Sequence, residues 1–333
     1  TQLTYGAIPI LPILDVAYYP AERGMYNYDT TGVDIEGLFT NPRDRWGGIQ
    51  RSLSTNDFEQ ANVEYIQFWL LDPFNSDAEA QNPNSSHSGG DLYFNLGNIS
   101  EDVLADSRKS IESGIPPFAG ANFPVDYTPW AKVADQQIVV NAFDLEPTSL
   151  VKQDVGLDGY NNQEEVTAYA QYVNWVQNSN LSAAAKARMI ADPSTDDYNF
   201  YRDDVYDQQE LNILQRYKKY NGLQGNSAPQ EVADTLNADK YATRANQLPD
   251  NEDINSDNNL SESEAYFQYK VSLTPQEMAV GKNFITSVVT FQPEGSTKVE
   301  KWYQFKIPLR TPERVVNGIR DFRSIRFLRL YLK

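Results

Sequence analysis

The chain has 333 residues and a formal net charge of −18, from 46 acidic and 28 basic side chains. It lacks the basic footprint that phosphate contacts require, so neither a nucleic-acid partner nor charge-driven docking on anionic lipid is expected. The absence of cysteine excludes thiol catalysis, zinc–thiolate sites and disulfide bonds.

The first half of the chain reads mainly as strands and turns. Residues 1–50 are rich in Pro, Gly and Tyr, which predicts extended chain and turns. Residues 63–71 predict a strong strand, and its apolar residues on both faces predict a central position in a sheet. A second strand is expected at 91–97, then a short helix at 101–113. Residues 115–150 are again Pro-rich and strand-like.

The second half changes from helices back to strands. Helical periodicity covers residues 164–176, 183–190 and 207–220, and strands are expected at 265–273, 283–291, 299–307 and 325–332. This order predicts a β-rich (α+β) fold, a jelly-roll-like β-sandwich with a helical insertion at about 164–240. Residues 1–163 and 241–333 would together form the sandwich domain. No apolar run approaches the ~20 residues of a membrane helix.

Two acidic loops of twelve residues lie near the ends of the helical block. Both place oxygen-bearing residues close to positions 1, 3, 5, 9 and 12 of a calcium loop, with a backbone carbonyl at position 7. The predicted Ca²⁺ ligands are Asp154, Asp158, Asn162 and Glu165 in the first loop, and Asp253, Asn255, Asp257, Asn259 and Glu264 in the second.

The second loop is the better calcium candidate on sequence grounds. All of its predicted ligands can supply hard oxygen, and Asn258 at position 6 tolerates the left-handed backbone that a glycine usually provides. The first loop has Gly159 at position 6, but Gly156 at position 3 removes one ligand. The alternative for both loops is a capped, solvated turn in a chain rich in Asp and Asn.

The sequence gives little support for a catalytic site. His87 is the only histidine, so a multi-His metal site cannot form, and no nucleophile-elbow motif is present. A glycosidase pair of carboxylates stays open, with Glu64 and Asp72 as candidate members. The tryptophans could form a sugar platform but are more simply explained as core residues. They are Trp46, Trp69, Trp130, Trp175 and Trp302.

A series of motifs in order along the chain carries a family resemblance. They are Tyr18-Tyr-Pro-Ala-Glu-Arg-Gly-Met-Tyr-Asn-Tyr28, Arg45-Trp-Gly-Gly48, the segments 57–74 and 90–102, Gln153-Asp-Val-Gly-Leu-Asp-Gly159, Arg216-Tyr-Lys-Lys-Tyr-Asn-Gly222, the segment 249–257, Lys301-Trp-Tyr-Gln-Phe-Lys-Ile-Pro308 and Phe322-Arg-Ser-Ile-Arg-Phe327. Together they resemble the SprA/Sov family, the outer-membrane translocon of the type IX secretion system of Bacteroidetes, which is also needed for gliding motility.

The resemblance implies passage of folded cargo through a very large β-barrel pore, without enzymatic activity. Because this sequence lacks the repeated lipid-facing alternation of barrel strands, we expect an extramembrane segment of a longer protein, with no lipid-spanning part. We expect it at the outer membrane or cell surface, on the extracellular side in preference to the periplasmic side. The implied partners are other segments of the same translocon chain, secreted cargo proteins and accessory outer-membrane subunits.

The expected function is a noncatalytic, calcium-stabilised domain that shapes the pore mouth and contacts cargo or accessory subunits. Two alternatives remain open at this point. One is a calcium-dependent carbohydrate-binding module of a surface protein, and the other is a glycoside hydrolase.

Overall fold

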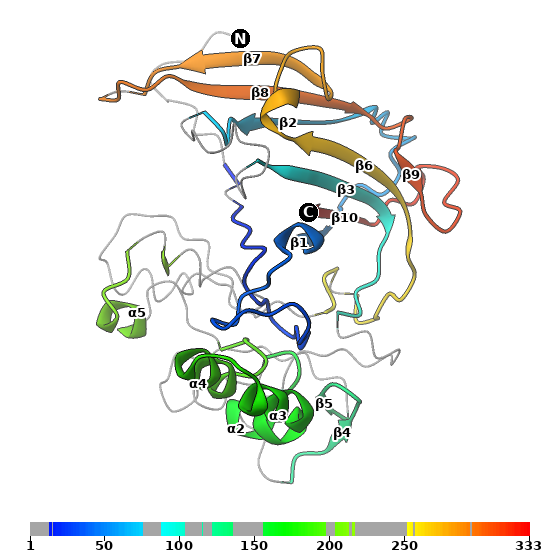
Figure 1. Cartoon of the computed structure of the whole chain (residues 1–333). Coiled ribbons are helices and arrows are strands. Elements are labelled where there is room, and N and C mark those ends of the chain that lie inside the picture. Colours follow the sequence, from blue (N-terminus) through cyan, green and yellow to red (C-terminus); the bar gives the residue numbers. More distant parts are fainter. Residues whose placement is uncertain are drawn as a thin grey trace.

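A computed structural model gives the fold. It describes residues 13–14, 16–75, 88–103, 115, 122–135, 156–197, 204–212, 215–216, 252–255, 257–293 and 295–333. Two β-sheets form one end of the molecule, and short helices with a small hairpin form the other (Figure 1). The described residues confirm the predicted β-rich α+β class.

The larger sheet has five antiparallel strands in the order β1-β10-β3-β6-β9. Their bounds are β1 Gly47–Ser52, β3 Gly90–Asn98, β6 Ala265–Leu273, β9 Arg314–Val315 and β10 Phe327–Leu332. Strand β1 lies where the sequence predicted only extended chain and turns. It forms because it pairs with β10, from Gly47 opposite Leu332 to Ser52 opposite Phe327. Such a distant partner leaves no trace in local composition.

The smaller sheet has three antiparallel strands in the order β2-β8-β7. Their bounds are β2 Tyr65–Leu71, β7 Ile285–Phe291 and β8 Glu300–Pro308. Among the described strands β2 is therefore an edge strand, and the predicted central position is wrong. Its Ile66, Phe68 and Leu70 pack against the core, whereas the alternate residues of the other face stay exposed. The apolar residues on the two faces of β2 therefore have different surroundings: one face packs against the core and the other is exposed.

The main hydrophobic core lies between the two sheets. It combines side chains of the larger sheet, such as Phe94 and Tyr269, with side chains of the smaller sheet, such as Phe305. Phe68 stacks on Phe305 with ring centroids 4.8 Å apart. The buried hydroxyl of Tyr269 donates to the carbonyl of Leu309 at 2.7 Å, so its polar end is paired. Each such side chain contributes roughly 1.5–3 kcal/mol by burial, which makes this core the main support of the two sheets.

The helices are short. The α-helices are α2 Asn162–Ala168, α3 Ala170–Asn178, α4 Ala183–Ala191 and α5 Asp204–Gln208, and the 3-10 helices are η1 Pro42–Asp44 and η3 Pro275–Glu277. The helix predicted over 164–176 is divided at Tyr169, whose φ of −102° and ψ of 37° are not helical. Residues 101–103 are not helical, so the start predicted for the helix over 101–113 is wrong. The rest of that helix lies outside the described residues.

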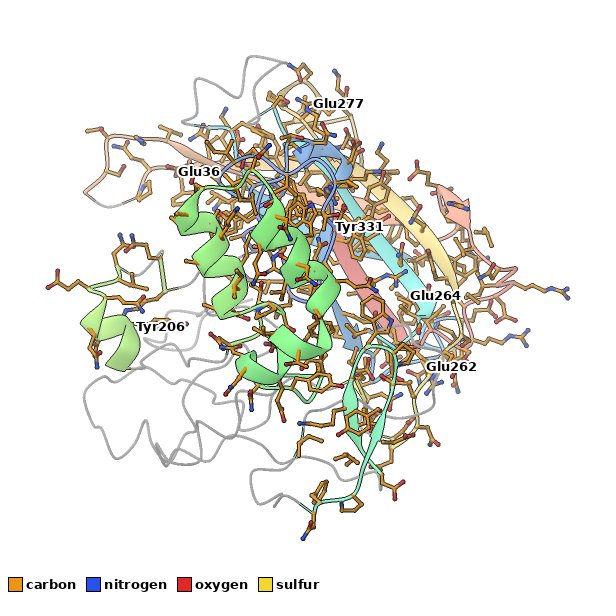
Figure 2. The ribbon with its side chains drawn as sticks, turned by 60° about the horizontal axis from the view of Figure 1, so that its bottom comes forward. Glu36, Tyr206, Glu262, Glu264, Glu277 and Tyr331 are labelled. Carbon is orange, nitrogen blue, oxygen red and sulfur yellow. The ribbon has the colours of Figure 1, made fainter. Side chains whose placement is uncertain are left out.

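The helices pack around a small core of their own, which includes Tyr172, Val176 and Met189. An N-terminal segment joins them. The N–H of Ser182 donates to the carbonyl of Ile35 at 2.7 Å. Figure 2 shows Glu36 beside these helices, where its carboxylate accepts the Ser182 hydroxyl at 3.2 Å.

The hairpin β4 Val125–Tyr127 and β5 Lys132–Ala134 also packs here, since the N–H of Lys132 donates to the carbonyl of Asp158 at 2.7 Å. Segments outside 164–240 thus contribute to the helical part, and the domain boundaries stay a prediction.

Candidate metal centre

A tight turn at residues 156–159 carries Asp158 into the interior. Gly156 and Gly159 have φ values of +40° and +70°, which favour glycine. A Cβ on Gly159 would lie 2.0 Å from the backbone oxygen of Lys132, so glycine lets β5 approach the turn closely. The side chain of Asp158 is fully buried, and its Oδ1 accepts the N–H of Tyr160 at 2.9 Å.

A capping box at the start of α2 fixes the direction of Glu165. The Asn161 side chain accepts the N–H groups of Gln163 and Glu164 at 3.1 and 3.0 Å, and the Glu164 carboxylate accepts the N–H of Asn161 at 3.3 Å. Glu165 follows in the first turn and is fully buried. Its Oε2 accepts the N–H of Ser194 at 2.9 Å. The cap therefore holds a carboxylate that points into the protein.

The turn after α4 supplies a third carboxylate, Asp196. Arg23 of the N-terminal segment holds this turn, because its guanidinium donates to the carbonyl of Pro193 at 2.5 Å and to that of Asp192 at 3.3 Å. Asp196 is 1% exposed. Its Oδ2 accepts the hydroxyl of Tyr26 at 2.9 Å. The N-terminal segment thus contacts the same site as the two helical turns.

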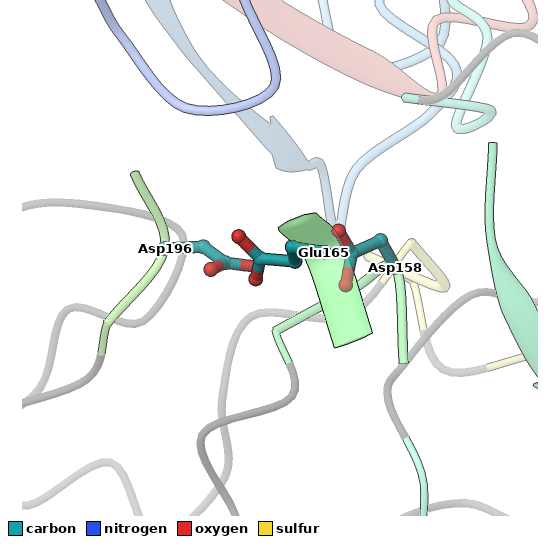
Figure 3. Close-up of side chains that lie close together, drawn as sticks. All are labelled: Asp158, Glu165 and Asp196. Atoms are coloured by element: carbon teal, nitrogen blue, oxygen red, sulfur yellow. The ribbon is translucent and has the colours of Figure 1, made fainter. Parts of the chain in front are cut away.

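Asp158, Glu165 and Asp196 converge in one buried site (Figure 3). One oxygen of each lies within 4.8 Å of the others, and within the described part of the chain no second group of at least three acidic or His side chains is so arranged. The Oε1 atom of Glu165 is buried and has no hydrogen-bond partner among the described residues. A buried carboxylate oxygen without a donor is costly, so this atom points to a bound cation or proton.

Neutral donors surround the three carboxylates. The hydroxyls of Tyr169 and Ser194 each donate to Oδ2 of Asp158 at 2.8 Å, and the hydroxyl of Tyr28 lies 2.9 Å from that of Ser194. None of the ion pairs among the described residues includes any of the three carboxylates. The surroundings therefore orient the negative charges without neutralising them.

Burial raises the pKa of all three carboxyls, because desolvation disfavours the charged form. The pKa rises to about 6 for Asp158, to about 7 for Glu165 and to about 10 for Asp196. Neighbouring carboxylates add to the increase for Glu165 and Asp196. Desolvation, with Asp197 nearby, also raises the pKa of Asp192 to about 6. At neutral pH the site must hold protons or a cation.

Carboxylate and neutral oxygens are a hard donor set, which suits Ca²⁺ or Mg²⁺ better than softer metals. The first predicted loop contributes Asp158 and Glu165 to it, and Asp154 lies outside the described residues. The amide of Asn162 donates to Oδ1 of Asp197 at 2.8 Å, and its own Oδ1 is buried without a partner among the described residues. Sequence reasoning missed Asp196, because only the fold brings the turn after α4 to the first loop.

The carboxylates of the second loop are engaged by protein donors. Asp253 accepts the N–H groups of Asp257 and Asn258 at 3.0 and 2.8 Å. The Asp257 side chain pairs with Arg326 at 3.0 Å. Two more predicted ligands are engaged as well: Asn255 Oδ1 accepts the N–H of Asp257 at 2.8 Å, and Glu264 pairs with Arg329 at 3.0 Å. At Asn259, whose predicted ligand is the backbone carbonyl, the side-chain amide donates to the carbonyl of Asp257 at 3.1 Å.

Glu101, which the sequence predicted as the start of a helix, is buried against the second loop and accepts hydrogen bonds from its backbone. It is 1% exposed and accepts the N–H groups of Ile254 and Ser261 at 3.0 and 3.2 Å. The loop is thus organised by amides and arginines, and its carboxylates do not converge. The geometry favours the first loop over the second, the reverse of the order expected from sequence. Metal binding at either loop stays a prediction.

The other sequence candidates are not brought together. His87 lies outside the described residues. Glu64 and Asp72 flank the two ends of β2, roughly 26 Å apart at about 3.3 Å per residue, too far for a glycosidase pair. The core interpretation is wrong for three tryptophans, since Trp46, Trp69 and Trp130 are 68%, 43% and 41% exposed.

Residues 171–333 match the SprA_N family model, described as a motility related/secretion protein. The match covers just under half of the chain and includes Asp196, the second loop and strands β6 to β10. No curated protein matches the chain. Among the helices that the structure describes, none has the length and apolar character to cross a membrane.

Proposed function

We infer from the SprA_N match that this chain belongs to the SprA/Sov family of motility-related secretion proteins, and we propose that it is a noncatalytic extramembrane domain of the type IX secretion translocon. In this role it shapes the pore mouth and contacts secreted cargo, accessory outer-membrane subunits and other segments of the translocon chain. It acts at the outer membrane, on the extracellular rather than the periplasmic side. The family match supports the secretion role.

We further propose that Ca²⁺ stabilises the domain at Asp158, Glu165 and Asp196. The unpartnered Oε1 of Glu165, buried beside two further carboxylates, carries this proposal. A cation there would join the first loop, the turn after α4 and, through Tyr26, the N-terminal segment. On the extracellular side a dissociation constant of roughly 10⁻⁴–10⁻³ M would be sufficient, as in other extracellular calcium modules.

The geometry supports a structural cation in preference to the alternatives. A cation that coordinates a sugar must be open to solvent, whereas these carboxylates are at most 1% exposed. A glycosidase needs two carboxyls ~5–10 Å apart in an accessible cleft, and the pair Glu64 and Asp72 does not meet that distance.

The secretion role is tested in the full-length parent. Removal of residues 1–333 should leave the translocon in the outer membrane but abolish cargo secretion and surface spreading. The purified chain should neither hydrolyse glycans nor bind a glycan array. Normal secretion by the truncated translocon, or glycan hydrolysis by the chain, would contradict the proposed role.

A further inference from the structure

Strand β2 presents an open backbone edge. Its first and last backbone contacts with β8 are the Leu309 N–H to the carbonyl of Glu64 and the Asp72 N–H to the carbonyl of Lys301, at 2.9 and 2.8 Å. Antiparallel pairing alternates, so Ile66, Phe68 and Leu70 bond to β8. The N–H and C=O groups of the alternate residues point away from the sheet. Those residues are Tyr65, Gln67, Trp69 and Leu71, and the described residues offer their backbone no partner.

The other described edges of the two larger sheets carry the features with which proteins discourage strand addition. Strand β7 is interrupted by a bulge between Ile285 and Ser287. Strand β9 has only two residues and contains Arg314, and β1 contains Arg51. Strand β2 has none of these features, since Tyr65–Leu71 contains no charge or proline and its register with β8 is unbroken. It is the edge in this part of the molecule best suited to accept another strand.

The outer face of β2 adds a side-chain surface to this edge. Tyr65, Trp69 and Leu71 are 40%, 43% and 41% exposed, and they share one face because side chains alternate along a strand. Trp302 of β8 lies opposite Leu71. A strand laid along β2 would gain backbone hydrogen bonds and would cover aromatic surface, as in recognition by β-strand addition.

The negative charge of the chain indicates which kind of added strand β2 favours. Glu64 precedes β2 with an exposed side chain, whereas Asp72 after β2 pairs with Lys301 at 3.8 Å, and the whole chain carries a net charge of −18. A second copy would carry the same large negative charge, which disfavours pairing of two copies. We propose that β2 binds an extended segment of a partner protein, apolar at alternate residues and flanked by basic side chains, as an added strand. This inference rests on the proposed function only for its setting, which is contact with cargo or accessory subunits.

The test uses the 333-residue chain and a short synthetic peptide in which valine and threonine alternate between pairs of lysines. Binding is measured by calorimetry at low and at high salt. The lysine peptide should bind and should weaken at high salt. A version with glutamates in place of the lysines, and a version with N-methylated central amides, should each bind at least roughly tenfold more weakly, because they lose charge attraction or hydrogen bonds.

A matched pair of variants locates the site. Gln67→Pro removes an N–H that points outward and leaves the pairing of β2 with β8 intact, so it should weaken peptide binding roughly tenfold or more. Gln67→Thr keeps that N–H and should bind like the wild type. Circular dichroism checks the fold of both variants, and the N-methylated peptide tests the same contact if Gln67→Pro does not fold.

Three results would overturn the inference. The lysine peptide does not bind, it binds equally well after N-methylation, or sedimentation shows that the chain dimerises through β2 instead. Calcium binding is measured separately with peptide absent, so the failure of this inference and the failure of the proposed cation site are distinguishable.

Discussion

A Cβ on Gly156 would lie 1.8 Å from a carboxylate oxygen of Asp196. The same Cβ would lie 2.5 Å from the hydroxyl of Tyr26, which donates to Asp196. In the sequence, Gly156 counts as a missing ligand at position 3 of the calcium loop. In the structure, that missing side chain leaves the space in which Asp196 supplies a carboxylate from another part of the chain.

Gly156→Ala should therefore displace Asp196 and strain a backbone with φ of +40°. We expect a loss of about 1–3 kcal/mol in the free energy of unfolding, together with weaker calcium binding. Chemical denaturation and calorimetry measure the two effects. Gly24→Ala is the matched control, because a Cβ there meets nothing within 4 Å. Equal stability and calcium affinity in the two variants would show that Gly156 does not make room for the site.

The stability of the calcium-free protein should fall as the pH rises from about 4 to about 7. The folded protein raises the pKa of Asp158 to about 6 and that of Glu165 to about 7. Over this range it binds more protons than the unfolded chain, so the free energy of unfolding decreases with pH. Asp196, with a pKa raised to about 10, extends the decrease to higher pH.

Denaturation in EDTA at pH 5 and pH 8 measures this effect. Calcium should restore stability more strongly at pH 8, because it competes with fewer protons there. A calcium-free protein that becomes more stable between pH 5 and pH 8 would contradict the cause given for these raised pKa values.

The second loop should stabilise the fold without binding calcium. Asp253→Ala removes the acceptor of two backbone N–H groups, those of Asp257 and Asn258. We expect a loss of about 1–3 kcal/mol in the free energy of unfolding, with calcium stoichiometry and affinity unchanged. Thermal unfolding with and without calcium checks both expectations. If this variant instead lost calcium binding, the ligands would lie in the second loop after all.

Strands with a strong local signal were predictable from sequence. Ala265–Leu273 alternates and lies at the predicted bounds, because one of its faces packs against the core. The position of β2 was not predictable in the same way. Apolar residues on both of its faces indicated a central strand, whereas the structure shows the residues of its outer face exposed.

The candidate site was predictable only in part. Asp158 and Glu165 are close in sequence, and the spacing of a calcium loop indicated both. Asp196 arrives through tertiary packing, and Arg23 holds its turn from the N-terminal segment, so no local pattern could indicate it. The second loop has a similar calcium-loop spacing. Its Asp257 and Glu264 carboxylates pair instead with Arg326 and Arg329, which come from the distant C-terminal region.

Calorimetric titration of the EDTA-stripped chain with calcium, for wild type, Asp196→Asn and Asp253→Asn, tests the cation site most directly. Wild type and Asp253→Asn should bind one Ca²⁺, whereas Asp196→Asn should lose detectable binding. The calcium-free Asp196→Asn protein should remain as stable as the calcium-free wild type, since it replaces a carboxyl that is protonated at neutral pH. No binding by stripped wild type, or undiminished binding by Asp196→Asn, would contradict a calcium site at Asp158, Glu165 and Asp196.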